Sequence, residues 1–223
     1  MTCLLHVSAS ARGTASFSRG VADRLVAAVR LEHPAIELRE RDLAAEPIPH
    51  IDAAFAAASL RPAEGRDGSD ELALALSETL IAELEAADIL VLSTPMHNFT
   101  TPSVVKAWID HLLRPGRTFR STPSGKVGLL NDRPAFVIVA CGGGFEGGAQ
   151  LDFFSPYIRY AFKTIGISEV QILRLEDLNR GPLKVEAALD KGRRWIEQQL
   201  AEIACRYRCA DDQASGRIPA GRD

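Results

Sequence analysis

The chain has 223 residues, 46% of them hydrophobic and 25% charged, and carries a formal net charge of −3 at pH 7. This length suits one domain with a full hydrophobic core, and the near-balanced charge argues against nucleic-acid binding. No apolar run approaches the roughly 18 residues of a membrane span, and the amino terminus lacks the layout of a signal peptide. We therefore expect a cytoplasmic protein that binds neither membranes nor nucleic acids.

The four cysteines are Cys3, Cys141, Cys205 and Cys209. They form no paired CxxC set, and no histidine cluster stands beside them. The spacing therefore predicts neither a disulfide framework nor a metal site.

The first part of the chain alternates strand and helix patterns. Residues 3–7 form a short apolar run that leads into the serine-rich loop 8–16. Apolar residues at three- and four-residue steps predict a helix from Ser16 to about Glu32, and a second strand spans 36–41. The segment 42–69, rich in Pro, Ala and Gly, reads as an excursion and surface loop.

The same alternation continues toward the middle of the chain. Leucines at helical spacing over 71–86 lead directly into a strand at 88–93. A helix is expected at 103–113 and a hairpin excursion at 118–130. The run 135–140 is almost continuously apolar, which is typical of a central parallel strand.

The last elements are a helix at about 156–165, a strand at 169–175 and a long helix from about 182 to 206. Five strands with interleaved helices predict a flavodoxin-like α/β fold: a doubly wound, five-stranded parallel sheet with helices on both faces. We expect one domain over residues 1–208, and a disordered tail over 209–223, which has little apolar surface to bury.

In a flavodoxin-like sheet, the first, third and fourth strands lie side by side. The loops that follow them are 8–18, 95–99 and 141–145. The first carries the hydroxyls of Ser10, Ser16 and Ser18 where a helix begins, and helix N-termini favour phosphate. Ser16 as a simple helix cap is the alternative. The motifs G-x-G-x-x-G and G-x-x-x-x-G-K-[ST] do not occur there, which argues against dinucleotide or nucleoside triphosphate binding by those motifs.

The other two loops suit a planar ring with polar edges. Met96 and Phe99 offer apolar surface and Asn98 offers an amide. The glycines after Cys141 allow a ligand to approach the backbone closely. A phosphate site beside a site for a polar-edged aromatic ring describes flavin mononucleotide (FMN).

Five segments, in order and spacing, resemble one family. They are Ser16-Phe-Ser18, Arg41-Asp-Leu43 followed by Pro47-Ile-Pro49, Pro95-Met-His-Asn-Phe99, Gly116-Arg-Thr-Phe119 and Gly142-Gly143. The chain from Cys3 to about Ala204 is similar to the FMN-dependent NADH:quinone oxidoreductases, the bacterial azoreductases. The resemblance implies a flavodoxin-like homodimer that passes electrons from a nicotinamide to quinones or azo dyes.

The resemblance also implies the cofactor-binding residues. By this likeness, Ser10, Ser16, Phe17 and Ser18 surround the FMN phosphate; Pro95, Met96, His97, Asn98 and Phe99 line the ring; and Ala140, Cys141, Gly142 and Gly143 form the loop at its pyrimidine edge. Four positions depart from the family pattern. Phe17 replaces a frequent Gln, His97 the usual Tyr and Ala140 the usual Ser, and an aromatic that often covers the substrate is replaced around Ser121.

The implied reaction is a ping-pong cycle in which hydride passes from NADH or NADPH through the flavin to a quinone or azo compound. Flavin carries the chemistry, so no separate catalytic residue is assigned. His97 is a candidate for orienting the acceptor or donating a proton, with packing as the alternative. Cys141 reads either as a redox thiol or as a small buried residue.

Two other classes of protein share this pattern. A flavodoxin-like FMN electron carrier is typically strongly acidic, which this chain is not. A non-enzymatic redox or ligand sensor would keep the fold, and the departures at His97, Ala140 and Cys141 favour it slightly. The homodimer expectation draws on the resemblance and on apolar residues around Trp108.

Overall fold

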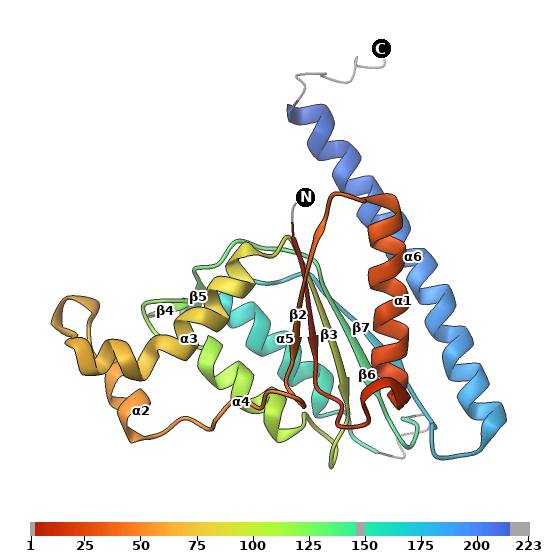
Figure 1. Ribbon diagram of the computed structural model, residues 1–223, viewed down its shortest axis with the longest axis horizontal. Helices are drawn as coiled ribbons and strands as arrows, with labels where there is room; N and C mark the ends of the chain where they lie inside the picture. The colour runs from red at the N-terminus through yellow and green to blue at the C-terminus, as the bar shows by residue number, and fades with distance from the viewer. Residues whose placement is uncertain (1–2, 146–149, 215–223) are drawn as a thin grey trace.

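A five-stranded parallel sheet forms the centre of the computed structural model, which describes residues 3–145 and 150–214 (Figure 1). Its strands are β1 (Cys3–Ser8), β2 (Glu37–Asp42), β3 (Ile89–Pro95), β6 (Ala135–Ala140) and β7 (Val170–Leu175), in the spatial order β2-β1-β3-β6-β7. Counted along the sheet strands alone, this is the order 2-1-3-4-5 of flavodoxin-like folds. The predicted fold is confirmed.

Helices cover both faces of the sheet (Figure 1). The helices α1 (Phe17–Glu32) and α6 (Pro182–Ala214) pack on one face, while α3 (Gly68–Ala86), α4 (Ser103–Leu112) and α5 (Phe154–Ile165) pack on the other. The expected hairpin is also present, as β4 (Phe119–Thr122) paired antiparallel with β5 (Gly125–Gly128).

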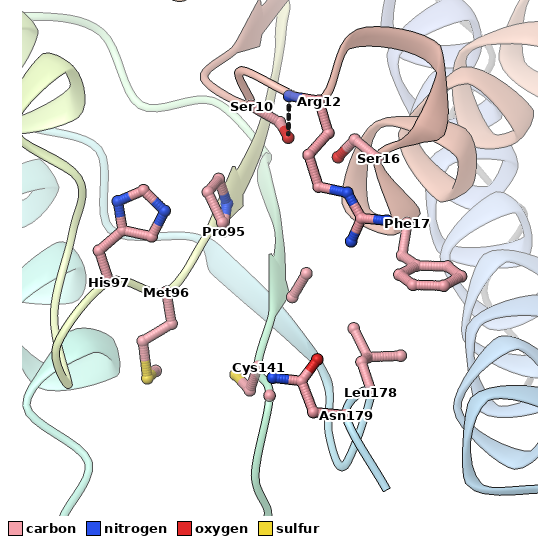
Figure 2. A pocket seen from close by; sticks show the side chains of 12 residues that line it. Ser10, Arg12, Ser16, Phe17, Pro95, Met96, His97, Cys141, Leu178 and Asn179 are labelled. Atoms are coloured by element: carbon pink, nitrogen blue, oxygen red, sulfur yellow. Dashed lines mark hydrogen bonds between the residues drawn. The ribbon is translucent and has the colours of Figure 1, made fainter. Parts of the chain in front are cut away.

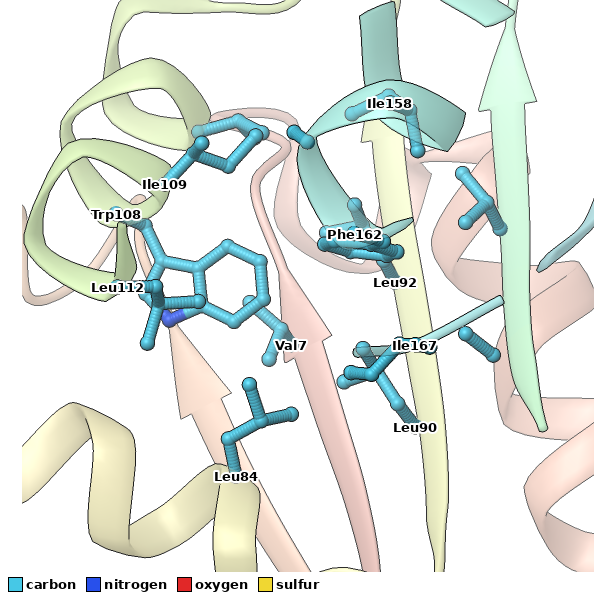
Figure 3. Packing of buried hydrophobic residues seen from close by; sticks show 14 of the residues in the cluster. Val7, Leu84, Leu90, Leu92, Trp108, Ile109, Leu112, Ile158, Phe162 and Ile167 are labelled. Atoms are coloured by element: carbon cyan, nitrogen blue, oxygen red, sulfur yellow. The ribbon is translucent and has the colours of Figure 1, made fainter. Parts of the chain in front are cut away.

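The central strand β6 is apolar along its whole length because both of its faces are buried. Figure 3 shows the core on the α4 and α5 side, where Trp108 meets Phe162 edge to face with ring centroids 6.2 Å apart. Trp108 is only 1% exposed. The apolar residues around it therefore belong to the core, and the expectation that they form an exposed contact face is wrong.

The segment between β2 and α3 is more ordered than the sequence analysis expected. It contains the helix α2 (Ala53–Leu60) and a short 3-10 turn, η2 (Ala63–Gly65). Alanine has the highest helix propensity, and the Asp52 carboxylate caps α2 by accepting the N–H of Phe55 at 2.8 Å. Phe55 and Ala58 of α2 pack with Leu74 of α3 in a small separate cluster.

The terminal helix is longer than expected, since α6 continues to Ala214. The predicted tail 209–223 therefore begins too early. Residues 209–214 contain neither Gly nor Pro, so nothing in them stops a helix from propagating. The rest of that tail, 215–223, lies outside the described residues.

Two leucines of α1 test the importance of this packing. Leu25 is fully buried between the sheet and α6, whereas Leu31 is 83% exposed. We expect Leu25→Ala to lower the free energy of unfolding by about 2–5 kcal/mol, because it removes buried apolar surface and leaves a cavity. Leu31→Ala, the matched control, should change it by less than about 0.5 kcal/mol. Urea unfolding followed by circular dichroism measures both, and equal effects would contradict this packing.

Candidate functional site

A cavity of about 180 Å³, open to solvent, lies at the carboxyl edge of the sheet (Figure 2). Four segments contribute to its wall: the loops after β1, β3, β6 and β7. The lining residues are Ser10, Arg12, Ser16, Phe17, Pro95, Met96, His97, Ala140, Cys141, Gly142, Leu178 and Asn179. A second cavity adjoins it and shares Met96, Cys141 and Gly142; its other lining residues are Asn98, Phe99, Gly143 and Gln150.

The loop after β1 presents hydrogen-bond donors and hydroxyls at the start of α1. Ser16 is the N-cap of α1, and its Oγ accepts the N–H of Arg19 at 3.4 Å. The first N–H groups of a helix have no acceptor inside the helix, so those of Phe17 and Ser18 are available at this end. Ser16 is thus both a helix cap and a cavity residue.

Ser10 and Ser18 differ in their access to the cavity. The Ser10 Oγ accepts the N–H of Arg12 at 3.4 Å, and Ser10 lines the cavity. The Ser18 side chain is fully buried, with its Oγ 3.2 Å from Ser16 Oγ, and it is not part of the cavity wall. Ser18 can therefore contribute only its backbone N–H.

The loop after β3 is a tight turn with an unusual backbone. His97 and Thr100 exchange two backbone hydrogen bonds of 3.0 Å. Between them, Asn98 and Phe99 have φ angles of 45° and 73°. Positive φ at two central residues is the pattern of a type I′ turn and is rare for phenylalanine. The turn leaves the Phe99 ring 55% exposed beside the second cavity. Such strain is found where a side chain must be presented to a ligand.

The glycine loop after β6 is attached to the loop after β7 through its carbonyl groups. The carbonyls of Cys141, Gly142 and Gly143 accept N–H groups from Leu178, Asn179 and Asp177, at 3.1, 3.1 and 3.2 Å. The N–H groups of Gly142 and Gly143 have no acceptor among residues 3–145 and 150–214. A Cβ at Gly142 would lie 2.5 Å from Asn179 Nδ2, so a larger residue there would displace the Asn179 side chain.

Arg174 on β7 and Glu176, which directly follows β7, hold Phe145 and Asp152. Glu176 accepts the N–H of Phe145 at 3.0 Å, and the Arg174 guanidinium lies 4.8 Å from the Phe145 ring centroid. Arg174 also donates to Asp152 at 2.6 Å. Although burial raises the pKa of Asp152, the N–H of Ser155 and the Arg174 guanidinium hold it below its usual value.

Three ionisable side chains line the two cavities in the described part of the chain: Arg12, His97 and Cys141. Burial raises the pKa of the Cys141 thiol to about 12, with the nearby Glu176 carboxylate acting in the same direction. The thiol is therefore neutral near pH 7, which supports the small buried residue over the redox thiol.

Of the 13 residues predicted for the site, all except Ser18 line one of the two cavities. The sequence analysis did not single out Arg12, Leu178, Asn179 or Gln150. Leu178 and Asn179 follow the fifth strand, and the rule that ligands bind at the carboxyl ends of parallel strands points to that loop as well. Gln150 follows the undescribed segment 146–149.

The donor set fits a ligand with an anion at one end and a polar-edged ring at the other. Hydroxyls, helix N–H groups and a guanidinium suit an anion. The glycine N–H groups suit carbonyl oxygens, and Pro95 and Met96 provide apolar surface between the two ends. This combination fits FMN.

The described residues contain neither a metal-ligand cluster nor a membrane-spanning helix. In the described ranges, no group of three or more His, Cys, Asp or Glu side chains is arranged to bind a metal ion. Likewise, no helix within those ranges is both long and apolar enough to cross a membrane.

Comparisons with known proteins agree with this geometry. Residues 2–200 match the family model described as a flavodoxin-like fold. The chain is 51% identical over 197 residues to an FMN-dependent NADH:quinone oxidoreductase of Cupriavidus pinatubonensis, covering 87% of this chain and 96% of that protein. It is 41% identical to one of Azotobacter vinelandii, covering 92% and 100%. The crystal structure of an azoreductase from Bacillus anthracis matches with a TM-score of 0.80 at 26% identity, covering 89% and 98%.

Alkylation tests the environment of Cys141. We expect iodoacetamide at pH 8 to modify the exposed Cys205 and to leave Cys141 unmodified in the folded protein, because the Cys141 thiol is buried and neutral. Peptide mass spectrometry gives the extent at each cysteine, and unfolding in urea should make Cys141 reactive. Modification of folded Cys141 as fast as of Cys205 would contradict the neutral buried thiol.

Proposed function

The chain belongs to the family of FMN-dependent NADH:quinone oxidoreductases, and on this premise we propose that it binds FMN at the carboxyl edge of the sheet and passes hydride from NADH to quinones and azo compounds. The observation that carries the proposal is the cavity itself. It joins an anion-binding donor set to two glycine N–H groups across an apolar surface.

The residues proposed to hold FMN come from three loops. Ser10, Ser16 and the helix N–H groups would bind the phosphate, and the segment 95–99 would flank the ring. When bound, FMN supplies the hydride chemistry by accepting hydride from NADH and giving it to the acceptor. Gly142 and Gly143 would direct their N–H groups at the oxygen-bearing edge of the ring, where negative charge develops.

His97 is the residue we propose for contact with the acceptor. Its backbone is held by Thr100, and its exposed side chain lines the cavity. Its imidazole has one nitrogen that can donate a hydrogen bond and one that can accept, so it can orient a quinone or azo acceptor.

Flavin retention and reduction test the proposed function. We expect the protein, loaded with FMN and desalted, to keep the visible flavin bands, to lose them on anaerobic addition of NADH, and to regain them when benzoquinone is added. Free FMN at the same concentration is the control, and steady-state quinone reduction by the protein should exceed its rate. Bands that NADH does not bleach would indicate an electron carrier, and loss of flavin on desalting would indicate a sensor without the cofactor.

We also propose that the protein is a homodimer, as the family resemblance implies, and that it works in the cytoplasm. Exposed apolar side chains at the second cavity, in the segment before α5 and on α5 support an interface: Phe99, Leu151, Phe153 and Tyr160 are 55–67% exposed. The exposed free thiol of Cys205 is suited to a reducing compartment.

Light scattering after gel filtration tests the homodimer. We expect a mass of twice the 24.2 kDa of the chain. Phe153→Asp should shift the mass toward one chain, because it places a charge in the proposed apolar contact. Leu31→Asp, on the exposed face of α1, is the control and should leave the mass unchanged. A single-chain mass for the unmodified protein would exclude the dimer.

A further inference from the structure

Arg12 lies at the edge of the cavity and has no counter-charge among the described residues. Its side chain extends from the loop after β1 toward the cavity, between Ser16 and Phe17 (Figure 2). The neighbouring Arg19 is paired with Asp42 at 2.6 Å. Among the described residues, Arg12 has no carboxylate within 4.0 Å. It belongs to the loop after β1, which is rich in hydrogen-bond donors.

An anion would be bound favourably at this end of the cavity. The N-terminus of α1 carries a partial positive charge, which favours anions. The first turn of α1 contains no acidic residue that would offset this charge. Arg12 is solvent-exposed, so an anion in the cavity would gain charge-assisted hydrogen bonds from its guanidinium as well as from the helix N–H groups.

Phe17 restricts where the Arg12 side chain lies. The guanidinium carbon is 5.5 Å from the centroid of the Phe17 ring, a cation–π contact. Phe17 cannot bond a phosphate through its side chain. Its ring instead offers a flat surface that keeps the guanidinium over the cavity.

We propose that Arg12 is the charged partner of the FMN phosphate and that Phe17 is its positioning residue. This inference rests on the proposed function. It assigns to Arg12 the selection of FMN over riboflavin, which has the same ring and ribityl chain and lacks the phosphate.

Equilibrium binding of FMN and riboflavin to the flavin-free, full-length protein tests this assignment, with quenching of flavin fluorescence as the readout. We expect Arg12→Gln to weaken FMN binding about tenfold and to change riboflavin binding less than about twofold, because only FMN carries the charge that Arg12 bonds. Raising NaCl from 0.05 to 0.5 M should weaken FMN binding to the unmodified protein more than to Arg12→Gln. Arg24→Gln removes the same charge from an exposed position on α1 and is the matched control, expected to bind both flavins normally.

A double-mutant cycle tests the role of Phe17. Phe17→Leu keeps an apolar side chain and removes the ring. We expect it to weaken FMN binding about threefold in the unmodified protein and to have no effect on FMN binding when Arg12 is already Gln. An equal effect of Phe17→Leu in both backgrounds would overturn its role in positioning Arg12.

The remaining outcomes separate this inference from the proposed function. If Arg12→Gln weakens both flavins equally, or neither, or if its only effect is on the KM for NADH, Arg12 is not the partner of the FMN phosphate. If the unmodified protein binds neither flavin, the proposed function fails first. Circular dichroism of each variant shows whether it is folded.

Discussion

The parallel pairing of β3 with β1 and β6 is the constraint on which the site depends. It places the carboxyl ends of three strands side by side, and the hydrogen bonding continues beyond the strands: Ala9 donates to Ser93, and Met96 donates to Ala140, at 2.9 and 2.8 Å. A buried polar contact adds to it. His6 Nε2 on β1 lies 3.0 Å from Ser93 Oγ on β3, and burial lowers the pKa of His6 to about 4, so that it stays neutral there.

Backbone groups form much of the site that this pairing creates. The carbonyls of Cys141, Gly142 and Gly143 are bonded to the loop after β7, which leaves the glycine N–H groups available to a ligand. The departures at Ala140 and His97 are compatible with a flavin site for this reason. Neither change removes a backbone donor, and the Cys141 side chain packs inward, at 1% exposure.

The two ends of the cavity have different chemistry. At the start of α1, hydroxyls, helix N–H groups and the Arg12 guanidinium produce a positive environment. Toward the second cavity, Phe99 is held in a strained turn and provides exposed aromatic surface. One ligand that carries a charged group and a flat ring can thus span both ends.

The sequence by itself determined the fold class and the strand order, because strand periodicity depends on local pattern and topology. Its family resemblance supplied 12 of the 16 residues that line the two cavities. It missed α2, where alanine propensity and the Asp52 cap act within a segment that reads as a loop. Only the tertiary structure decided which side chains face the cavity. Two outcomes depend on neighbours far away in the chain, such as Asp42 on β2. One is whether a serine lines the cavity, as Ser10 does and Ser18 does not. The other is whether a cation has a carboxylate partner among the described residues, as Arg19 has and Arg12 has not.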